Sequence, residues 1–185
     1  MDDLPSDDWI NNGGNFINTN HIHESIHDPH LSIFEKNLFT DGWFVKSMPD
    51  LNQRNELLET YLIQNSIWWI EYANLSGFRV DTYPYVDKHF LSAWSMRISS
   101  EYPNFNFVGE EWNDNPTIVS YWQKDSPRHD DYVSFIPSMM DFPLQSAIVK
   151  GLKEKESWNS GIGNIFRVLA NDFQYGNPYL SLIHI

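Results

Sequence analysis

The chain has 185 residues, of which 41% are hydrophobic and 16% aromatic, and it contains no cysteine. This length and apolar content are enough for one domain with a sizeable core, and they exclude an intrinsically disordered chain. The net charge of −13 argues against nucleic acid as a partner, because nucleic-acid binding needs a basic surface. The lack of cysteine excludes disulfides and thiolate metal sites, and no apolar run approaches the ~20 residues of a membrane span.

The segment 1–50 predicts irregular structure, because Asn11-Asn12-Gly13-Gly14-Asn15 and the steps Asp28-Pro29 and Met48-Pro49 interrupt regular elements. A polar segment of this length with weak periodicity is typical of a functional excursion. Apolar residues then recur at three- and four-residue intervals, which predicts a helix over about 55–74 with one wide apolar face. We expect Asp50 or Asn52 to cap this helix and Ser76-Gly77 to end it.

Strands and helices are predicted to alternate along the rest of the chain. The expected strands cover 78–81, 105–110 and 132–140, and the expected helices cover 86–100, 117–123, 144–153 and 165–173. The helix over 86–100 is expected to face inward with Phe90, Leu91, Trp94 and Ile98. This order predicts an α/β fold with a parallel sheet, which fits either a doubly wound sheet or a (β/α) barrel. The apolar run Tyr179–Ile185 stops without a turn or cap, so we expect a truncated strand or an unrelated tail, and in either case a fragment.

Two of the predicted strands end abruptly in a carboxylate. Asp81 follows Gly77-Phe78-Arg79-Val80, and Glu110 follows Phe107-Val108-Gly109. Side chains at the carboxyl ends of parallel strands meet at one rim, where one acid can stay ionised and attack while another stays protonated. Arg79 lies on the same side of its strand as Asp81 and can hold it ionised. Taken alone, the pattern leaves open that these acids cap helices or pair with basic groups.

Glu111 competes with Glu110 for the position in the cleft. Adjacent strand residues face opposite sides, so only one of the two acids can point inward. We predict that Glu110 does, with Trp112 on the same face as an aromatic wall or sugar platform, and that Glu111 makes a supporting pair.

A second motif offers a different chemistry. His23-Glu24-Ser25-Ile26-His27 matches H-E-x-x-H, in which two histidines one helical turn apart bind zinc. That motif needs a sustained helix, whereas Asp28-Pro29 follows at once and histidine is locally abundant. A histidine-rich loop is therefore the preferred interpretation, and a zinc metallohydrolase the lesser alternative.

The segments 77–81 and 108–112 resemble the second and third signature regions of the α-amylase family of glycoside hydrolases. Those regions have the patterns G-F-R-x-D and G-E-x-W, at the ends of the fourth and fifth barrel strands. Met48-Pro49-Asp50-Leu51-Asn52 and the segment Asn65–Ile70 are similar, more narrowly, to the neopullulanase and cyclomaltodextrinase branch. The resemblance to that branch runs from about Asp3 to Tyr179.

The resemblance implies part of a TIM (β/α)8 barrel, about strands four to six with their helices. Residues 1–50 would be the excursion after the third strand, and residues 51–185 a partial catalytic barrel truncated before the seventh strand. Asp81 matches the nucleophile, Glu110 the general acid/base and Arg79 the arginine beside the nucleophile, in a retaining mechanism. Substrate contacts are expected from Trp112, Tyr83 and Tyr85, although Pro84 and Tyr85 stand where many amylases carry Lys-His.

The implied activity is hydrolysis of α-1,4 bonds in cyclodextrin, pullulan or maltooligosaccharides. No residue of this chain is assigned to a metal, and calcium and homo-oligomerisation are left open for the complete enzyme. Related enzymes occur in both the periplasm and the cytoplasm, so localisation is open too. The first and fourth signature regions of the family are missing from this sequence. The fourth would supply a third carboxylate that orients the sugar, so the resemblance places that carboxylate outside this chain. The chain alone is therefore expected to be inactive. A non-catalytic glucan-binding module is the alternative.

Overall fold

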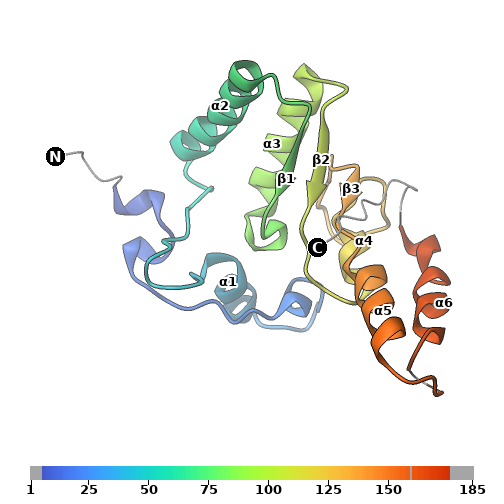
Figure 1. Ribbon diagram of the computed structural model, residues 1–185. Helices are drawn as coiled ribbons and strands as arrows, with labels where there is room; N and C mark the ends of the chain where they lie inside the picture. The colour runs from blue at the N-terminus through green and yellow to red at the C-terminus, as the bar shows by residue number, and fades with distance from the viewer. Residues whose placement is uncertain (1–5, 159, 176–185) are drawn as a thin grey trace. The chain divides into compact units, whose positions relative to one another are not determined.

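A computed structural model of the protein describes residues 6–158 and 160–175 (Figure 1). The chain divides into two compact units. The first unit consists of Met1–Leu75 and Pro84–Pro103, and the second, here the sheet unit, consists of Ser76–Tyr83 and Asn104–Ile185. In the described part of the chain, no helix is both long enough and apolar enough to span a membrane.

The sheet unit is built on three parallel strands, β1 (Gly77–Val80), β2 (Asn106–Gly109) and β3 (Ser138–Met139), in the order β1-β2-β3 (Figure 1). Val80 pairs with Gly109, which pairs with Met139. The ladder continues one step further, because the N–H of Glu110 donates to Val80 O and that of Met140 to Gly109 O. The residues that follow the strands therefore meet at one rim, as expected for an α/β fold.

Helices α4 (Pro116–Tyr121), α5 (Phe142–Lys153) and α6 (Gly163–Leu169) follow strands β2 and β3 in the chain. The Asn115 side chain accepts from Thr117 N at the start of α4, and the Asp141 side chain accepts from Leu144 N at the start of α5. These caps satisfy backbone donors that a helix leaves unpaired. Helices α5 and α6 lie side by side (Figure 1).

In the first unit, helix α2 (Glu56–Ala73) packs against helix α3 (Lys88–Glu101). The four residues predicted to face inward from α3 are all buried: Phe90, Leu91, Trp94 and Ile98. The indole N–H of Trp94 donates to Ser66 Oγ across this contact. The buried face predicted for this helix is thus confirmed, and the observed helix begins two residues later and ends one residue later than the predicted 86–100.

The expectation of a wholly irregular first segment was wrong, because it contains helix α1 (Ile33–Asp41). Ser32 caps this helix by accepting from Glu35 N, and Ser-x-x-Glu is a recognised start signal. Gly42 follows the helix, where a Cβ atom would lie 2.4 Å from Thr19 Cα. Only glycine permits so close an approach of two backbone segments.

Helix α2 differs from expectation at both ends and on its surface. Asn55 caps it, not Asp50 or Asn52, and it ends at Asn74 in the left-handed conformation (φ 52°), before Ser76-Gly77. Leu58 and Ile70 are buried, but five large side chains of this helix are exposed: Leu57, Tyr61, Trp68, Trp69 and Tyr72. Trp68 and Tyr72 instead stack on each other, with ring centroids 4.7 Å apart.

The strands are shorter or less covered than predicted. β3 comprises two residues and not 132–140, because the chain before it forms a loop held by the Arg128 guanidinium. That group donates to the carbonyls of Tyr121 and Ser126 and stacks over the Tyr132 ring. β1 lies at the edge of the sheet and is partly exposed on both faces, unlike the doubly buried strands that are typical of parallel sheets.

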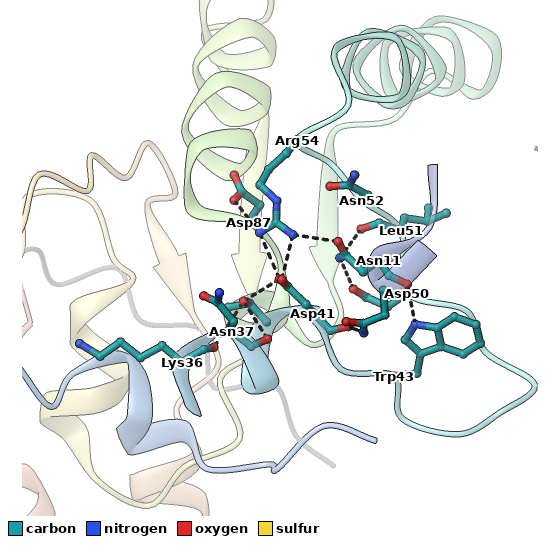
Figure 2. A network of polar contacts seen from close by, with 12 residues as sticks. Asn11, Lys36, Asn37, Asp41, Trp43, Asp50, Leu51, Asn52, Arg54 and Asp87 are labelled. Carbon is teal, nitrogen blue, oxygen red and sulfur yellow. Dashed lines mark hydrogen bonds and ion pairs between the residues drawn. The ribbon is translucent and has the colours of Figure 1, made fainter. Parts of the chain in front are cut away.

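A polar network organises the first unit (Figure 2). Arg54 donates to Asn11 Oδ1 at 2.8 Å and pairs with Asp41 at 3.0 Å and Asp87 at 3.9 Å. The Asn11 amide in turn donates to Asp50 Oδ2 at 2.7 Å. Since Asp41 ends α1 and Asp87 caps α3, the network joins the irregular segment to two helices.

Replacement of Asp50 by asparagine should make the protein more stable at neutral pH. Burial raises the pKa of Asp50 from 3.8 to about 6, against the opposing effect of the Asn11 hydrogen bond. Because the pKa of this carboxyl is higher in the folded than in the unfolded state, its contribution to the free energy of unfolding falls as the pH rises from 3.8, its unfolded pKa, through about 6, its folded pKa. We expect Asp50→Asn to gain about 1–2 kcal/mol relative to wild type between pH 4 and pH 7, by urea unfolding. A stability difference between Asp50→Asn and wild type that does not change with pH would contradict the raised pKa of Asp50. Asp131→Asn, which changes an exposed acid, is the control.

Replacement of Gly109 by alanine should destabilise the sheet unit. A Cβ atom there would lie 2.8 Å from Met139 Sδ and 3.3 Å from Tyr83 Cγ, inside van der Waals contact. Overpacking of this kind costs about 1–3 kcal/mol, and urea unfolding measures it. Gly163→Ala is the matched control, because its nearest neighbour is Glu156 Oε1 at 3.4 Å and the position begins α6. Equal stability of the Gly109→Ala and wild-type proteins would show that the packing is not tight.

Candidate active site

Two acids and one arginine come together where β1 and β2 end. Asp81 and Glu110 each follow directly on the last residue of a strand, and those two last residues, Val80 and Gly109, are paired in the sheet. Arg79 precedes Asp81 by two positions, so both side chains leave the same face of β1. The register of the sheet thus places all three groups at the same rim.

The Arg79 guanidinium bridges the two carboxyls. Its Nη1 lies 2.7 Å from Asp81 Oδ2, and its Nη2 lies 2.6 Å from Glu110 Oε1. The two acids also share a hydrogen bond with each other. The Glu110 side chain is 8% exposed, whereas that of Asp81 is 69% exposed. One acid is therefore enclosed and the other open to an incoming molecule.

The turn that follows Asp81 adds two backbone donors to Glu110. The N–H of Thr82 donates to Glu110 Oε2 at 3.0 Å, and the N–H of Tyr83 donates to the Glu110 carbonyl oxygen at 3.1 Å. Thr82 is in the left-handed region, with φ at 47°. Nothing in the sequence signals this conformation, because a β-branched residue is rarely found there.

The two carboxyls have opposite electrostatic environments. Burial raises the pKa of Glu110, and the hydrogen bond with Asp81 raises it further, against the Thr82 N–H and the Arg79 charge. For Asp81, the hydrogen bond with Glu110 lowers the pKa, and the contacts with Arg79 lower it further. The pKa of Asp81 is therefore lowered while that of Glu110 is raised. Two acids whose pKa values are driven apart can act as proton donor and nucleophile.

Glu111 and Trp112 extend the site in different directions. Glu111 is fully buried and accepts a hydrogen bond from the Trp122 indole N–H at 2.9 Å, which gives it the supporting position expected of it. Trp112 is 66% exposed and stacks on Phe142, with centroids 5.1 Å apart and planes inclined by 14°. A flat, exposed and braced indole offers an apolar face to a ligand.

The two tyrosines expected to contact substrate are both buried. Tyr83 is fully buried, and its hydroxyl lies 2.9 Å from that of Tyr132. Tyr85 belongs to the first unit, where its ring stacks on Phe39 at 4.2 Å and its hydroxyl lies 3.2 Å from His23 Nε2. Neither ring presents a face at the rim in this conformation, so direct contact with a ligand stays a prediction.

The H-E-x-x-H motif lies on a short 3₁₀ helix, His23–Ile26, and not on an α-helix. With three residues per turn, this geometry does not place residues 23 and 27 on one face. The described residues contain no group of three or more histidine, cysteine or acidic side chains arranged to hold a metal ion.

Comparison with known proteins gives consistent relatives. A cyclomaltodextrinase from Thermoanaerobacter pseudethanolicus is 28% identical over 102 residues, which are 55% of this chain and 16% of that protein. An intracellular maltogenic amylase from Bacillus subtilis is 31% identical over 70 residues, 38% of this chain and 12% of that protein. The chain thus matches less than one fifth of the length of these relatives.

The fold agrees with a solved enzyme structure. The α-amylase of Geobacillus thermoleovorans in complex with acarbose superposes with a TM-score of 0.63, at 28% identity, over 90% of this chain and 37% of that one. This confirms the prediction of part of a TIM barrel. The model of the α-amylase catalytic domain matches residues 35–165, more than half of the chain and including Arg79, Asp81 and Glu110. The chain therefore belongs to the α-amylase family of glycoside hydrolases.

Proposed function

We propose that the complete gene product containing this chain hydrolyses α-1,4-glucosidic bonds of cyclodextrin, pullulan or maltooligosaccharides by a retaining double displacement. The observation that carries the proposal is the Arg79 guanidinium, which lies within 2.7 Å of both Asp81 and Glu110. Such a bridge orients two acids whose pKa values differ in the directions that the reaction needs. Residues 51–185 would supply this part of the barrel, and residues 1–50 the excursion before it.

In the first step, the Asp81 carboxylate attacks the anomeric carbon of the sugar. The bond between that carbon and the glycosidic oxygen breaks, and Glu110 gives its proton to the departing oxygen. The low pKa of Asp81 keeps it ionised for attack, and its 69% exposure leaves it open to the sugar. The raised pKa of Glu110 keeps the proton available.

In the second step, Glu110 is ionised and takes a proton from water. That water attacks the anomeric carbon, the bond to Asp81 breaks, and the sugar leaves with its original configuration. The contact between the two carboxyls supports retention, because inverting enzymes keep their acids ~6.5–9.5 Å apart to admit a water molecule. Arg79 contacts both acids and so balances the negative charge as it moves from one to the other.

The substrate class follows from the relatives and from Trp112. The curated relatives are named for cyclomaltodextrin and maltose-releasing activities. Trp112 presents an exposed indole two residues after Glu110, where it can stack on a sugar ring. Tyr83 is assigned a packing role in this proposal, because its ring is fully buried.

Asp81 can be tested directly as the nucleophile in the complete gene product. A fluorinated glycosyl trap should add one glycosyl group to the wild-type protein in intact mass spectrometry, because the covalent intermediate accumulates. Asp81→Asn should show no adduct in the same measurement. In a kinetic assay, Glu110→Gln should lower kcat about 10²- to 10⁴-fold, as expected for the loss of a general acid. Asp131→Asn serves as the matched acid control. An adduct that persists in Asp81→Asn would rule out Asp81 as nucleophile.

The pH dependence of kcat/KM should reflect both acids. We expect a bell whose acid limb lies below the ordinary range of aspartate and whose alkaline limb lies above that of glutamate, because the pKa of Asp81 is lowered and that of Glu110 raised. Initial rates at low substrate concentration measure the profile. In Glu110→Gln the alkaline limb should disappear, and its survival at the same pH would assign it to another group.

A further inference from the structure

Thr82 has an unfavourable backbone conformation at the centre of the site. Its φ of 47° lies in the left-handed region, which β-branched side chains avoid for steric reasons. A residue stays in such a conformation only where the surrounding structure enforces it, and these residues cluster at functional sites.

The conformation directs two successive backbone donors toward one residue. Thr82 N–H reaches Glu110 Oε2 at 3.0 Å, and Tyr83 N–H reaches Glu110 O at 3.1 Å. Glu110 Oε1 is meanwhile held by Arg79 at 2.6 Å. Each oxygen of the carboxyl thus has its own donor, one from the Arg79 side chain and one from the Thr82 backbone, and the backbone of Glu110 is held as well.

The buried Tyr83 ring holds this turn in place through its packing contacts. The ring is fully buried, and its hydroxyl lies 2.9 Å from the Tyr132 hydroxyl. It is nearly perpendicular to the Trp122 ring, with centroids 5.6 Å apart. Gly109 leaves the space that the ring needs, since a Cβ atom there would lie 3.3 Å from Tyr83 Cγ. The backbone at Thr82 is therefore confined between a strand end and a fixed aromatic side chain.

We propose that Thr82 is a positioning residue that acts through its backbone: the left-handed turn, anchored by Tyr83, holds the Thr82 N–H on Glu110 Oε2 and so fixes the orientation of the carboxyl. This rests on the proposed function for the role of Glu110, whereas the contact itself is a property of this chain. The N–H also favours the ionised form of Glu110, because it lowers the pKa of that carboxyl. It therefore stabilises the carboxylate that forms when the proton is delivered.

The first test uses the unmodified 185-residue chain. An N–H that donates to a carboxyl changes its proton shift when that carboxyl ionises. We expect the Thr82 amide resonance, followed by NMR against pH, to move with the Glu110 side-chain resonance, and this response to vanish in Glu110→Gln. A Thr82 amide that ignores the ionisation of Glu110 would overturn the proposal, whatever the enzyme's activity.

The second test removes only the donor. In the complete gene product, the amide at position 82 is replaced by an ester through incorporation of α-hydroxyisovalerate, and Thr82→Val is the matched control with the same side chain and the N–H intact. We expect kcat/KM of the ester variant to lie about 10- to 100-fold below that of Thr82→Val, as a lost hydrogen bond to a charged group implies. Its alkaline limb should move to higher pH. Equal rates and equal pH profiles would contradict the positioning role.

Thr82→Gly separates the backbone from the side chain. Glycine adopts φ near 47° without steric cost and keeps the N–H, so the amide response to Glu110 should persist. Loss of that response in a folded Thr82→Gly protein would mean that the threonine side chain is needed, against the proposal. Full activity of Glu110→Gln would instead refute the proposed function and leave the amide contact standing.

Discussion

The Arg79 guanidinium, in contact with both Asp81 and Glu110, is the interaction on which the site depends. Two carboxyls in hydrogen-bonding contact repel each other when both are ionised, and the guanidinium between them offsets that repulsion. The arrangement requires the register of the sheet, which pairs Val80 with Gly109 and so brings the next residue of each strand to the same level. A one-residue slip would turn one of the acids to the opposite face. The pairing of β1 with β2 therefore determines how Arg79, Asp81 and Glu110 lie relative to one another.

The enclosed acid is supported by a series of packing contacts. Gly109 lacks a side chain, which admits the Tyr83 ring, and the buried ring fixes the turn in which Thr82 points its N–H at Glu110. Glu111 is held separately by the Trp122 indole, so the two adjacent glutamates have different environments although their chemistry is the same. Burial raises the pKa of Glu110, and the hydrogen bond with Asp81 raises it further.

The strands β1 and β2 and the position of the two acids could be predicted from the sequence. A short apolar run that ends in an acid indicates a strand and places that acid at its carboxyl end. The inward face of α3 and the pairing of Arg79 with Asp81 follow from periodicity alone. The conformation of Thr82 could not be predicted, since tertiary contacts impose it against the local preference of a β-branched residue. The exposed aromatic face of α2 was missed for a related reason: periodicity shows that a face is apolar but not what covers it.

The contacts among Arg79, Asp81 and Glu110 shift the pKa values of the two carboxyls in opposite directions, that of Asp81 downward and that of Glu110 upward. The most direct measurement is a titration of the side-chain carboxyl ¹³C resonances of these two residues in the isotope-labelled chain, with Arg79→Met for comparison. We expect Asp81 to titrate below, and Glu110 above, the ordinary range of its residue type, and both pKa values to rise when the guanidinium is removed. Two carboxyls that titrate together in the ordinary range, unaffected by Arg79→Met, would contradict it.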